Sequence, residues 1–183
     1  MQSFRCSTRT LIGFAVFACI LIHERTGLFA QADSKSQSVA RRNEQLTAEA
    51  WKALEKKAMR EAIAKADKCI ESFEASAMKI QKQLEKARAR VPKGEATEDE
   101  KKVVHQNGLL NDVATCYFIK GKAHEGLNEK DAAIAAYKTA AKLTYARTWD
   151  PAGPWFWSPA DAATERLEEL RPSEAAGLGA KHE

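Results

Sequence analysis

The stretch ATCYFIKGKAHEGLNEKDAAIAAYKTAAKL, residues 114–143, decides the fold. Its apolar and small residues recur at three- and four-residue steps, which is the spacing of one face of an α-helix. Gly126 interrupts this pattern, so the sequence predicts one helix from about 110 to 125 and another from about 130 to 143. Two helices joined by so short a connection pack antiparallel against each other.

This helix pair resembles a tetratricopeptide unit, a helical repeat of 34 residues. In that family the first helix carries a large aromatic residue, then Gly, Ala and an aromatic residue, and the second helix carries Ala, an aromatic residue and Ala. The residues that take these packing positions here are Tyr117, Gly121, Ala123, Ala133, Tyr137 and Ala140. The pattern is broken where Lys120, Asn128 and Tyr145 replace the usual Leu, turn glycine and closing proline.

A weaker unit of the same kind fits residues 50–73. Its Ala62 lies 71 residues before Ala133, close to two repeat lengths. The intervening residues 76–108 lack the motif, so we expect them to extend a helix rather than to form a third unit.

Helix signals also mark the rest of the chain. Glycine and proline are absent from residues 44–91, which predicts a short helix to about Lys57, a tight turn and a longer helix from about 60 to 90. Thr97 and Glu100 have the spacing of a capping box and open a short helix that ends near His105.

The last helix is expected from about 159 to 170, because Ser158-Pro159 places an N-cap before a proline at the first helical position. No alternating strand pattern is found along the chain. The sequence therefore predicts an all-α fold of antiparallel helix pairs, a tetratricopeptide-like repeat domain with a C-terminal capping helix.

The N-terminus has the form of a secretory signal. Arg5 and Arg9 precede the uncharged run 11–22 (LIGFAVFACILI), which is too short to span a bilayer, and small residues favour cleavage after Ala32. A lipid anchor at Cys19 and a retained anchor are the alternatives. Cleavage after residue 32 directs the protein to the periplasm or the medium.

The mature chain would hold 151 of the 183 residues, enough for one domain. We expect a signal peptide over 1–32, a flexible leader over 33–44, the helical domain over 45–172 and a disordered tail over 173–183. The signal removes three basic residues and one acidic residue, so the net charge falls from +4 to +2. Such a balanced charge argues against a nucleic-acid partner.

The resemblance also implies a binding surface. First helices of successive units line a concave groove that takes extended peptides, and the groove positions here would be Thr115, Phe118, Lys122 and Glu125. The alternative is a stable helical domain whose groove is filled by its own chain. A carboxylate clamp is not expected, because Ile119 stands where the clamp needs Asn. The same alignment brings Cys69 towards Cys116, as buried free thiols by default or as a disulfide.

A tryptophan-rich segment follows the repeat. It holds Trp149, Trp155, Phe156 and Trp157 among three prolines, so it must be an extended strap rather than a helix. The indoles either fold back as a cap over the open end of the helix pairs or stay outside as an aromatic platform for sugars or a partner. We favour the cap, with one indole partly accessible.

Motifs of enzymes are missing: the sequence has no G-x-S-x-G, no Walker-type loop, no H-E-x-x-H and no C-x-x-C. The cysteines and histidines Cys69, Cys116, His105 and His124 lack compact metal-ligand spacing, so no metal or other cofactor is expected. The sequence favours a non-enzymatic protein–protein adaptor or assembly subunit of the cell envelope. A glycan- or cell-wall-binding accessory protein that uses residues 149–157 is the second hypothesis, and an enzyme of unrecognised type the third.

Overall fold

The computed structural model describes residues 42–92, 94–149 and 156–171. The predicted signal peptide, the leader up to residue 41 and the tail 173–183 lie outside these residues. Residues 42–44, which we assigned to the leader, are already helical. The described elements are a helix over residues 42–55, α2 (Met59–Ala87), α3 (Glu98–Gln106), α4 (Gly108–Gly126), α5 (Lys130–Ala141), β1 (Thr148–Trp149), β2 (Phe156–Trp157) and α6 (Pro159–Glu169).

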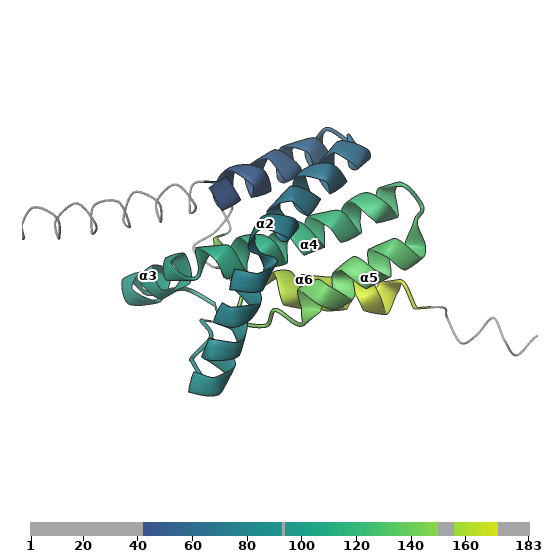
Figure 1. Ribbon diagram of the computed structural model, residues 1–183. Helices are drawn as coiled ribbons and strands as arrows, with labels where there is room; N and C mark the ends of the chain where they lie inside the picture. The colour runs from purple at the N-terminus through teal and green to yellow at the C-terminus, as the bar shows by residue number, and fades with distance from the viewer. Residues whose placement is uncertain (1–41, 93, 150–155, 172–183) are drawn as a thin grey trace, which may run out of the picture. The chain divides into compact units, whose positions relative to one another are not determined.

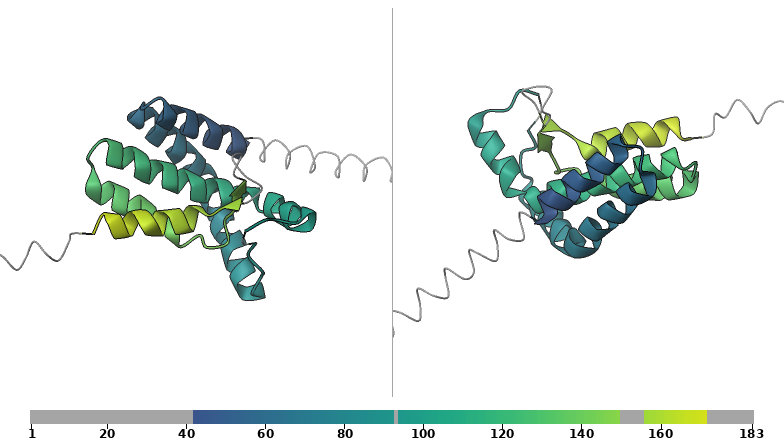
Figure 2. Two further views of the ribbon diagram at one scale, coloured as in Figure 1. Left: turned by 180° about the vertical axis from the view of Figure 1, so that it is seen from behind. Right: turned by 90° about the horizontal axis from the view of Figure 1, so that it is seen from above.

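The all-α prediction is confirmed, because helices packed against one another form the domain, and two short strands are the only ones among the described residues. α4 is the central element and packs against α2, α5 and α6 (Figure 1). Its buried residues lie on nearly all of its sides, as expected for a helix covered by several neighbours. Figure 2 shows α6 running alongside α5.

The pair α4–α5 is packed through Gly121. A Cβ atom at Gly121 would lie only 2.5 Å from Cε1 of Tyr137, so the ring occupies the space that a larger side chain would need. Tyr137 is fully buried beside Ala133 and Ala140. The small residues therefore let the two helices approach with an aromatic ring between them.

Three helices end in the same way, with a residue in the left-handed conformation that is not glycine. These residues are Lys57 (φ 59°), Arg88 (φ 49°) and Asn128 (φ 60°). Each end carries the two hydrogen bonds of a Schellman motif, as in Lys57 N–H to Leu54 O (2.9 Å) and Ala58 N–H to Ala53 O (2.9 Å). The motif at Arg88 ends α2 at Ala87, earlier than the expected end near 90.

The predicted helix starts of α3 and α6 are confirmed. Thr97 accepts from the N–H of Glu100 (3.3 Å) while Glu100 accepts from the N–H of Thr97 (3.0 Å), which is a capping box. Ser158 accepts from the N–H of Asp161 (3.2 Å) and Pro159 is the first residue of α6.

The tryptophan-rich segment contributes a pair of antiparallel strands that the sequence pattern did not predict. Thr148 is opposite Trp157, and Trp149 is opposite Phe156. Both described ends of the segment are thus extended, and the pairing brings the chain back to α4 before α6 begins.

Candidate functional site

The face of α4 that we expected to line an open groove is covered by the chain itself. Thr115 is fully buried; its hydroxyl donates to Asn111 O (2.8 Å) and lies 3.0 Å from that of Thr148. Phe118 is only 9% exposed, and its ring centre lies 5.0 Å from that of Trp157. As a correction, Thr115 and Phe118 belong to the packed core and offer no surface to a peptide.

The other end of this face is closed by α6. Arg166 Nε donates to Glu125 (3.1 Å), a second nitrogen of Arg166 pairs with the same carboxylate, and the hydroxyl of Tyr137 donates to it. Burial alone would raise the pKa of Glu125, but the hydrogen bonds from Arg166 and Tyr137 bring it below its usual value. Glu125 therefore already has an internal partner, and Lys122 is half-buried beside it.

The covering residues form an aromatic cluster of Trp51, Phe118, Tyr137 and Trp157. Trp157 lies 6.2 Å from Trp51 between ring centres, and Phe118 lies 5.7 Å from Tyr137. The cluster thus joins the helix over residues 42–55, α4, α5 and β2. The position of Trp157 agrees with the cap interpretation, since its ring packs on the core.

The opposite face of the strand pair holds Trp149 and Phe156, because neighbouring residues of a strand point to opposite sides. Their ring centres are 5.3 Å apart in an edge-to-face arrangement. Trp149 is 39% exposed, and the ammonium of Lys101 lies 5.3 Å from its ring centre. The segment therefore divides its aromatic residues between core and solvent, while Trp155 lies outside the described residues.

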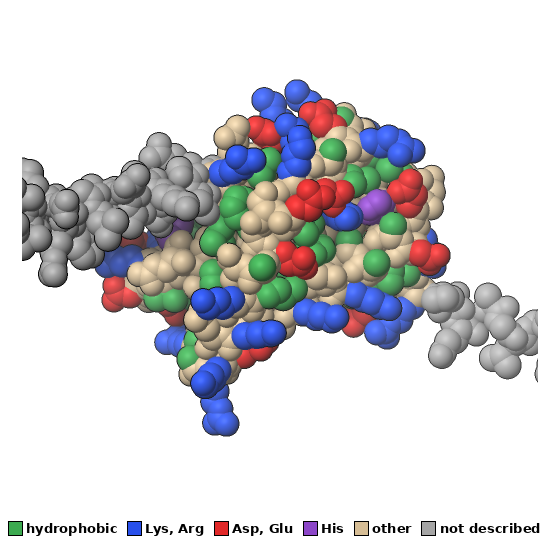
Figure 3. Space-filling view, in the orientation of Figure 1, with side chains coloured by type: hydrophobic (Ala, Val, Ile, Leu, Met, Phe, Trp, Pro, Cys, Tyr) green, Lys and Arg blue, Asp and Glu red, His purple; other side chains and the backbone are tan. Residues whose placement is uncertain are grey.

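An apolar groove runs between α5 and α6, with a volume of about 510 Å³. Its apolar residues Ile134, Leu167 and Leu170 are all half-buried. Its charged lining residues are Lys130, Asp131, Lys138 and Arg171. Figure 3 shows Lys and Arg side chains over α5 and along the C-terminal part of α2. The groove thus combines an apolar floor with a predominantly basic rim.

Sequence reasoning missed this groove, although part of its signal was present. Leu167 and Leu170 are three residues apart and share one face of α6. That this face meets Ile134 of α5 depends on how the two helices cross, which the helical periodicity does not reveal.

A second hollow, of about 400 Å³, lies where the loop before α3 meets β2 and α6. Arg147 reaches into its lining although it is 6% exposed. Its guanidinium donates to Pro92 O (3.2 Å), Thr144 O (3.1 Å) and the hydroxyl of Ser158 (3.2 Å). Burial lowers the pKa of Arg147, and the nearby Asp161 partly compensates. Arg147 therefore ties three separate segments together.

The two cysteines predicted to approach each other do so. Cys69 of α2 and Cys116 of α4 are fully buried, and both are free thiols in the structure. The hydroxyl of Thr47 lies 3.8 Å from the sulfur of Cys69 and 3.3 Å from that of Cys116. The structure thus has the default arrangement of buried free thiols rather than the disulfide.

Within residues 42–92, 94–149 and 156–171, no group of three or more His, Cys, Asp and Glu side chains is arranged to hold a metal ion. In the same part of the chain no helix is long and apolar enough to cross a membrane. Comparisons of the chain with protein families, with curated proteins and with solved structures find no match.

Proposed function

We propose that this chain is a non-enzymatic, tetratricopeptide-like helical protein that works outside the cytoplasm by binding another protein. The observation that supports this best is the α5–α6 groove, with Ile134, Leu167 and Leu170 as its floor and basic residues on its rim. Binding grooves combine an apolar lining with a few polar groups that fix orientation.

The partner that fits this groove is an amphipathic helix with acidic residues beside its apolar stripe. Such a helix lays its apolar face into a groove and places residues at steps of three and four along it. Three of the four charged lining residues are cations, namely Lys130, Lys138 and Arg171, so carboxylates on the partner would be complementary. The rim gives orientation and association rate, and the apolar floor gives affinity.

Synthetic peptides test this directly. A helical peptide with Leu at three- and four-residue steps and flanking Glu should bind the full chain, and its Lys-for-Glu counterpart should not. Lys138→Glu should weaken the Glu peptide about tenfold, which corresponds to about 1.4 kcal/mol. Ile134→Asn should also weaken it, because it places an amide on the apolar floor.

Lys52→Glu is the matched control, since Lys52 is also exposed but belongs to the helix over residues 42–55, on the other side of α4 from α5 (Figure 1). Equal binding of both peptides, or equal affinity of Lys138→Glu and Lys52→Glu, would contradict the proposal. A pull-down from the envelope fraction extends the test to the natural partner: one stoichiometric protein should be recovered by the wild type and by Lys52→Glu, and lost with Lys138→Glu.

Export is part of the same proposal and rests on the N-terminal pattern of Arg5, Arg9 and the uncharged run 11–22. Mass spectrometry of the exported form should find a chain that begins near Asp33. An intact Met1 or a lipid-modified Cys19 would show that the segment is kept or processed differently.

The exposed Trp149, in edge-to-face contact with the half-buried Phe156, supports a second candidate function, the binding of glycan or cell-wall polymer. Retention of the chain on purified wall polymer would favour this function. Trp149→Ala should then abolish retention while lowering the free energy of unfolding by less than about 1 kcal/mol, because Trp149 lies on the solvent side of the strand pair.

A further inference from the structure

Outside the proposed binding groove, two reactive groups lie close together: the thiols of Cys69 and Cys116, between α2 and α4. Cys69 and Cys116 are separated by 47 positions in the sequence yet contact the same hydroxyl, that of Thr47. The three residues come from three helices, so the packing of the whole domain brings the two sulfur atoms together. Packing alone does not require two thiols at such a position, where Ala or Val would fill the space.

We propose that Cys69 and Cys116 form an oxidisable dithiol, which reacts with low-molecular-weight disulfides and closes to a disulfide that joins α2 to α4. This inference is independent of the proposed binding function and concerns a different part of the domain.

The two thiols are not equivalent. Hydrogen bonding by the Cys116 thiol lowers the pKa of Cys69, and the same contact is the largest cause that raises the pKa of Cys116. The thiolate is the reacting form of cysteine in such exchanges. Cys69 is therefore the attacking residue and Cys116 the resolving one.

The reaction has two steps. The Cys69 thiolate attacks one sulfur of the reagent R–S–S–R, which breaks the S–S bond and releases one RS⁻. Cys116, after losing its proton, then attacks the Cys69 sulfur of the mixed disulfide and releases the second RS⁻. The two cysteines lose two electrons and two protons, and the reagent gains them as two RSH molecules.

Burial controls the rate of this reaction. Both sulfur atoms are fully covered, and the helix over residues 42–55 lies on them through Thr47. A reagent reaches Cys69 when this helix moves away from α2 and α4, which is a local opening rather than global unfolding. Oxidation should therefore be slow in the folded protein and faster at low concentrations of urea.

Oxidised glutathione is the probe for the test. The full chain is incubated with it, quenched in acid, alkylated under denaturing conditions without reductant, and digested with trypsin. The expected product is a disulfide-linked pair of peptides, residues 69–79 and 103–120. Most of the protein should yield its Cys69 in this linked form. The linked form should unfold at a higher urea concentration, and dithiothreitol should reverse both changes.

Single variants test the order of the two steps. Cys116→Ser should stop the reaction at a glutathione adduct on Cys69, whereas Cys69→Ser should leave Cys116 largely unmodified. Thr47→Val removes the hydroxyl that contacts both sulfur atoms and should slow the first step about fivefold, the factor equivalent to a hydrogen bond of about 1 kcal/mol. Thr139→Val, on α5, is the matched control.

Two outcomes would overturn the proposal. In one, Cys69 and Cys116 of the wild-type chain are both alkylated after long exposure to oxidised glutathione. In the other, glutathione adducts form on each cysteine with no linked peptide, which would mean that the thiols cannot reach each other.

Discussion

At the scale of single residues, Gly121 is the position where one added carbon has the largest expected effect. A methyl group there would overlap the buried ring of Tyr137. We expect Gly121→Ala to lower the free energy of unfolding by roughly 1–3 kcal/mol, the usual cost of overpacking. Urea unfolding followed by circular dichroism measures the change.

Gly108, at the start of α4, is the matched control. The nearest atom to a Cβ there is Asn43 Nδ2 at 4.0 Å, so Gly108→Ala has room and should leave stability unchanged or slightly raised. If both variants unfold at the same urea concentration, the ring of Tyr137 does not fill the space beside Gly121, and the predicted overlap is wrong.

Asp112 makes stability depend on pH. Burial raises its pKa from 3.8 to about 7, although hydrogen bonding to Asn43 and Thr47 acts in the opposite direction, and Glu44 adds to the rise. Between about pH 4 and pH 7 the folded protein keeps a proton that the unfolded chain has released. The free energy of unfolding should therefore be highest below this window and fall as the pH rises through it, by roughly 4 kcal/mol at most.

Asp112→Asn should remove this dependence. The variant is expected to equal the wild type below about pH 4, where Asp112 is protonated in both the folded and the unfolded protein, and to unfold at higher urea concentration near pH 8, since no carboxylate is left to ionise in the core. The titratable groups around it, Glu44, Cys69 and Cys116, stay in place in this comparison. Asp131→Asn, on the exposed side of α5, serves as control, and a pH profile of Asp112→Asn parallel to that of the wild type would contradict the assignment.

At the scale of helices, the turn between residues 42–55 and α2 holds Lys57 in a conformation that suits glycine better. A residue with a Cβ atom in the left-handed conformation costs roughly 1–2 kcal/mol, and glycine avoids this cost. Glycine also gives the unfolded chain more conformational entropy, which offsets part of the gain. Lys57→Gly should thus raise the free energy of unfolding by about 0.5–1 kcal/mol. Thermal unfolding measures it.

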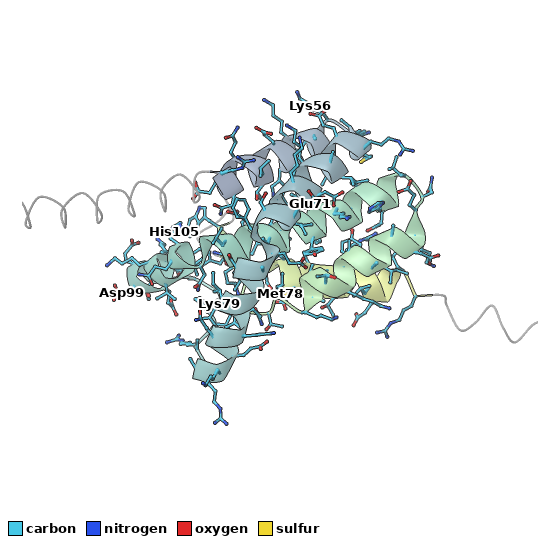
Figure 4. The ribbon with its side chains drawn as sticks, in the orientation of Figure 1. Lys56, Glu71, Met78, Lys79, Asp99 and His105 are labelled. Carbon is cyan, nitrogen blue, oxygen red and sulfur yellow. The ribbon has the colours of Figure 1, made fainter. Side chains whose placement is uncertain are left out.

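Lys56→Gly is the comparison within the same turn (Figure 4). The positive-φ residues do not include Lys56, so glycine there should lower stability or leave it unchanged. A larger gain from Lys56→Gly than from Lys57→Gly would show that the left-handed residue is placed wrongly.

The helix ends differ in how well the sequence predicts them. The start of α3 at the capping box and that of α6 at Ser158-Pro159 follow from local side-chain chemistry, and both are found as expected. The end of α2 is different. Arg88 takes the left-handed conformation that usually marks a glycine, and nothing in the sequence around an arginine indicates that a helix ends there. The strand pair was missed for a related reason: two residue pairs are too few for an alternating pattern.

The candidate sites depend more strongly on contacts distant in sequence. The approach of Cys69 to Cys116 was implied by the alignment to the tetratricopeptide repeat, and in the structure both sulfur atoms contact the hydroxyl of Thr47. The sequence left open whether the chain itself fills the groove at Thr115 and Phe118. It did not identify the residues that cover them, Thr148 and Trp157, which come from a later part of the chain. Helical periodicity tells which residues face inward but not which later segment they meet.

At the scale of the whole domain, stability should depend on the inward half of the strand pair. Trp157 packs against Phe118 and Trp51, whereas Trp149 lies on the solvent side. We expect Trp157→Ala to lower the free energy of unfolding by about 3–5 kcal/mol, the cost of a large aromatic cavity. Trp149→Ala should cost less than about 1 kcal/mol, because exposed positions away from such features change stability little.

Tryptophan fluorescence adds an independent readout of the same comparison. Iodide should quench the Trp157→Ala variant more strongly than Trp149→Ala, because the indoles that remain include the exposed one. Equal losses of stability in the two variants would mean that the strand pair is not divided into an inner and an outer face.

The aromatic cluster also constrains when the domain can fold during synthesis. Trp51 belongs to the first described helix, but its partner Trp157 is made more than a hundred residues later and α6 later still. The α4 face therefore stays uncovered until residue 157 has left the ribosome, and the core closes only after that. For a chain that we propose to be exported, this delay keeps the polypeptide unfolded, so that it can enter a translocation channel before Trp157 completes the aromatic cluster.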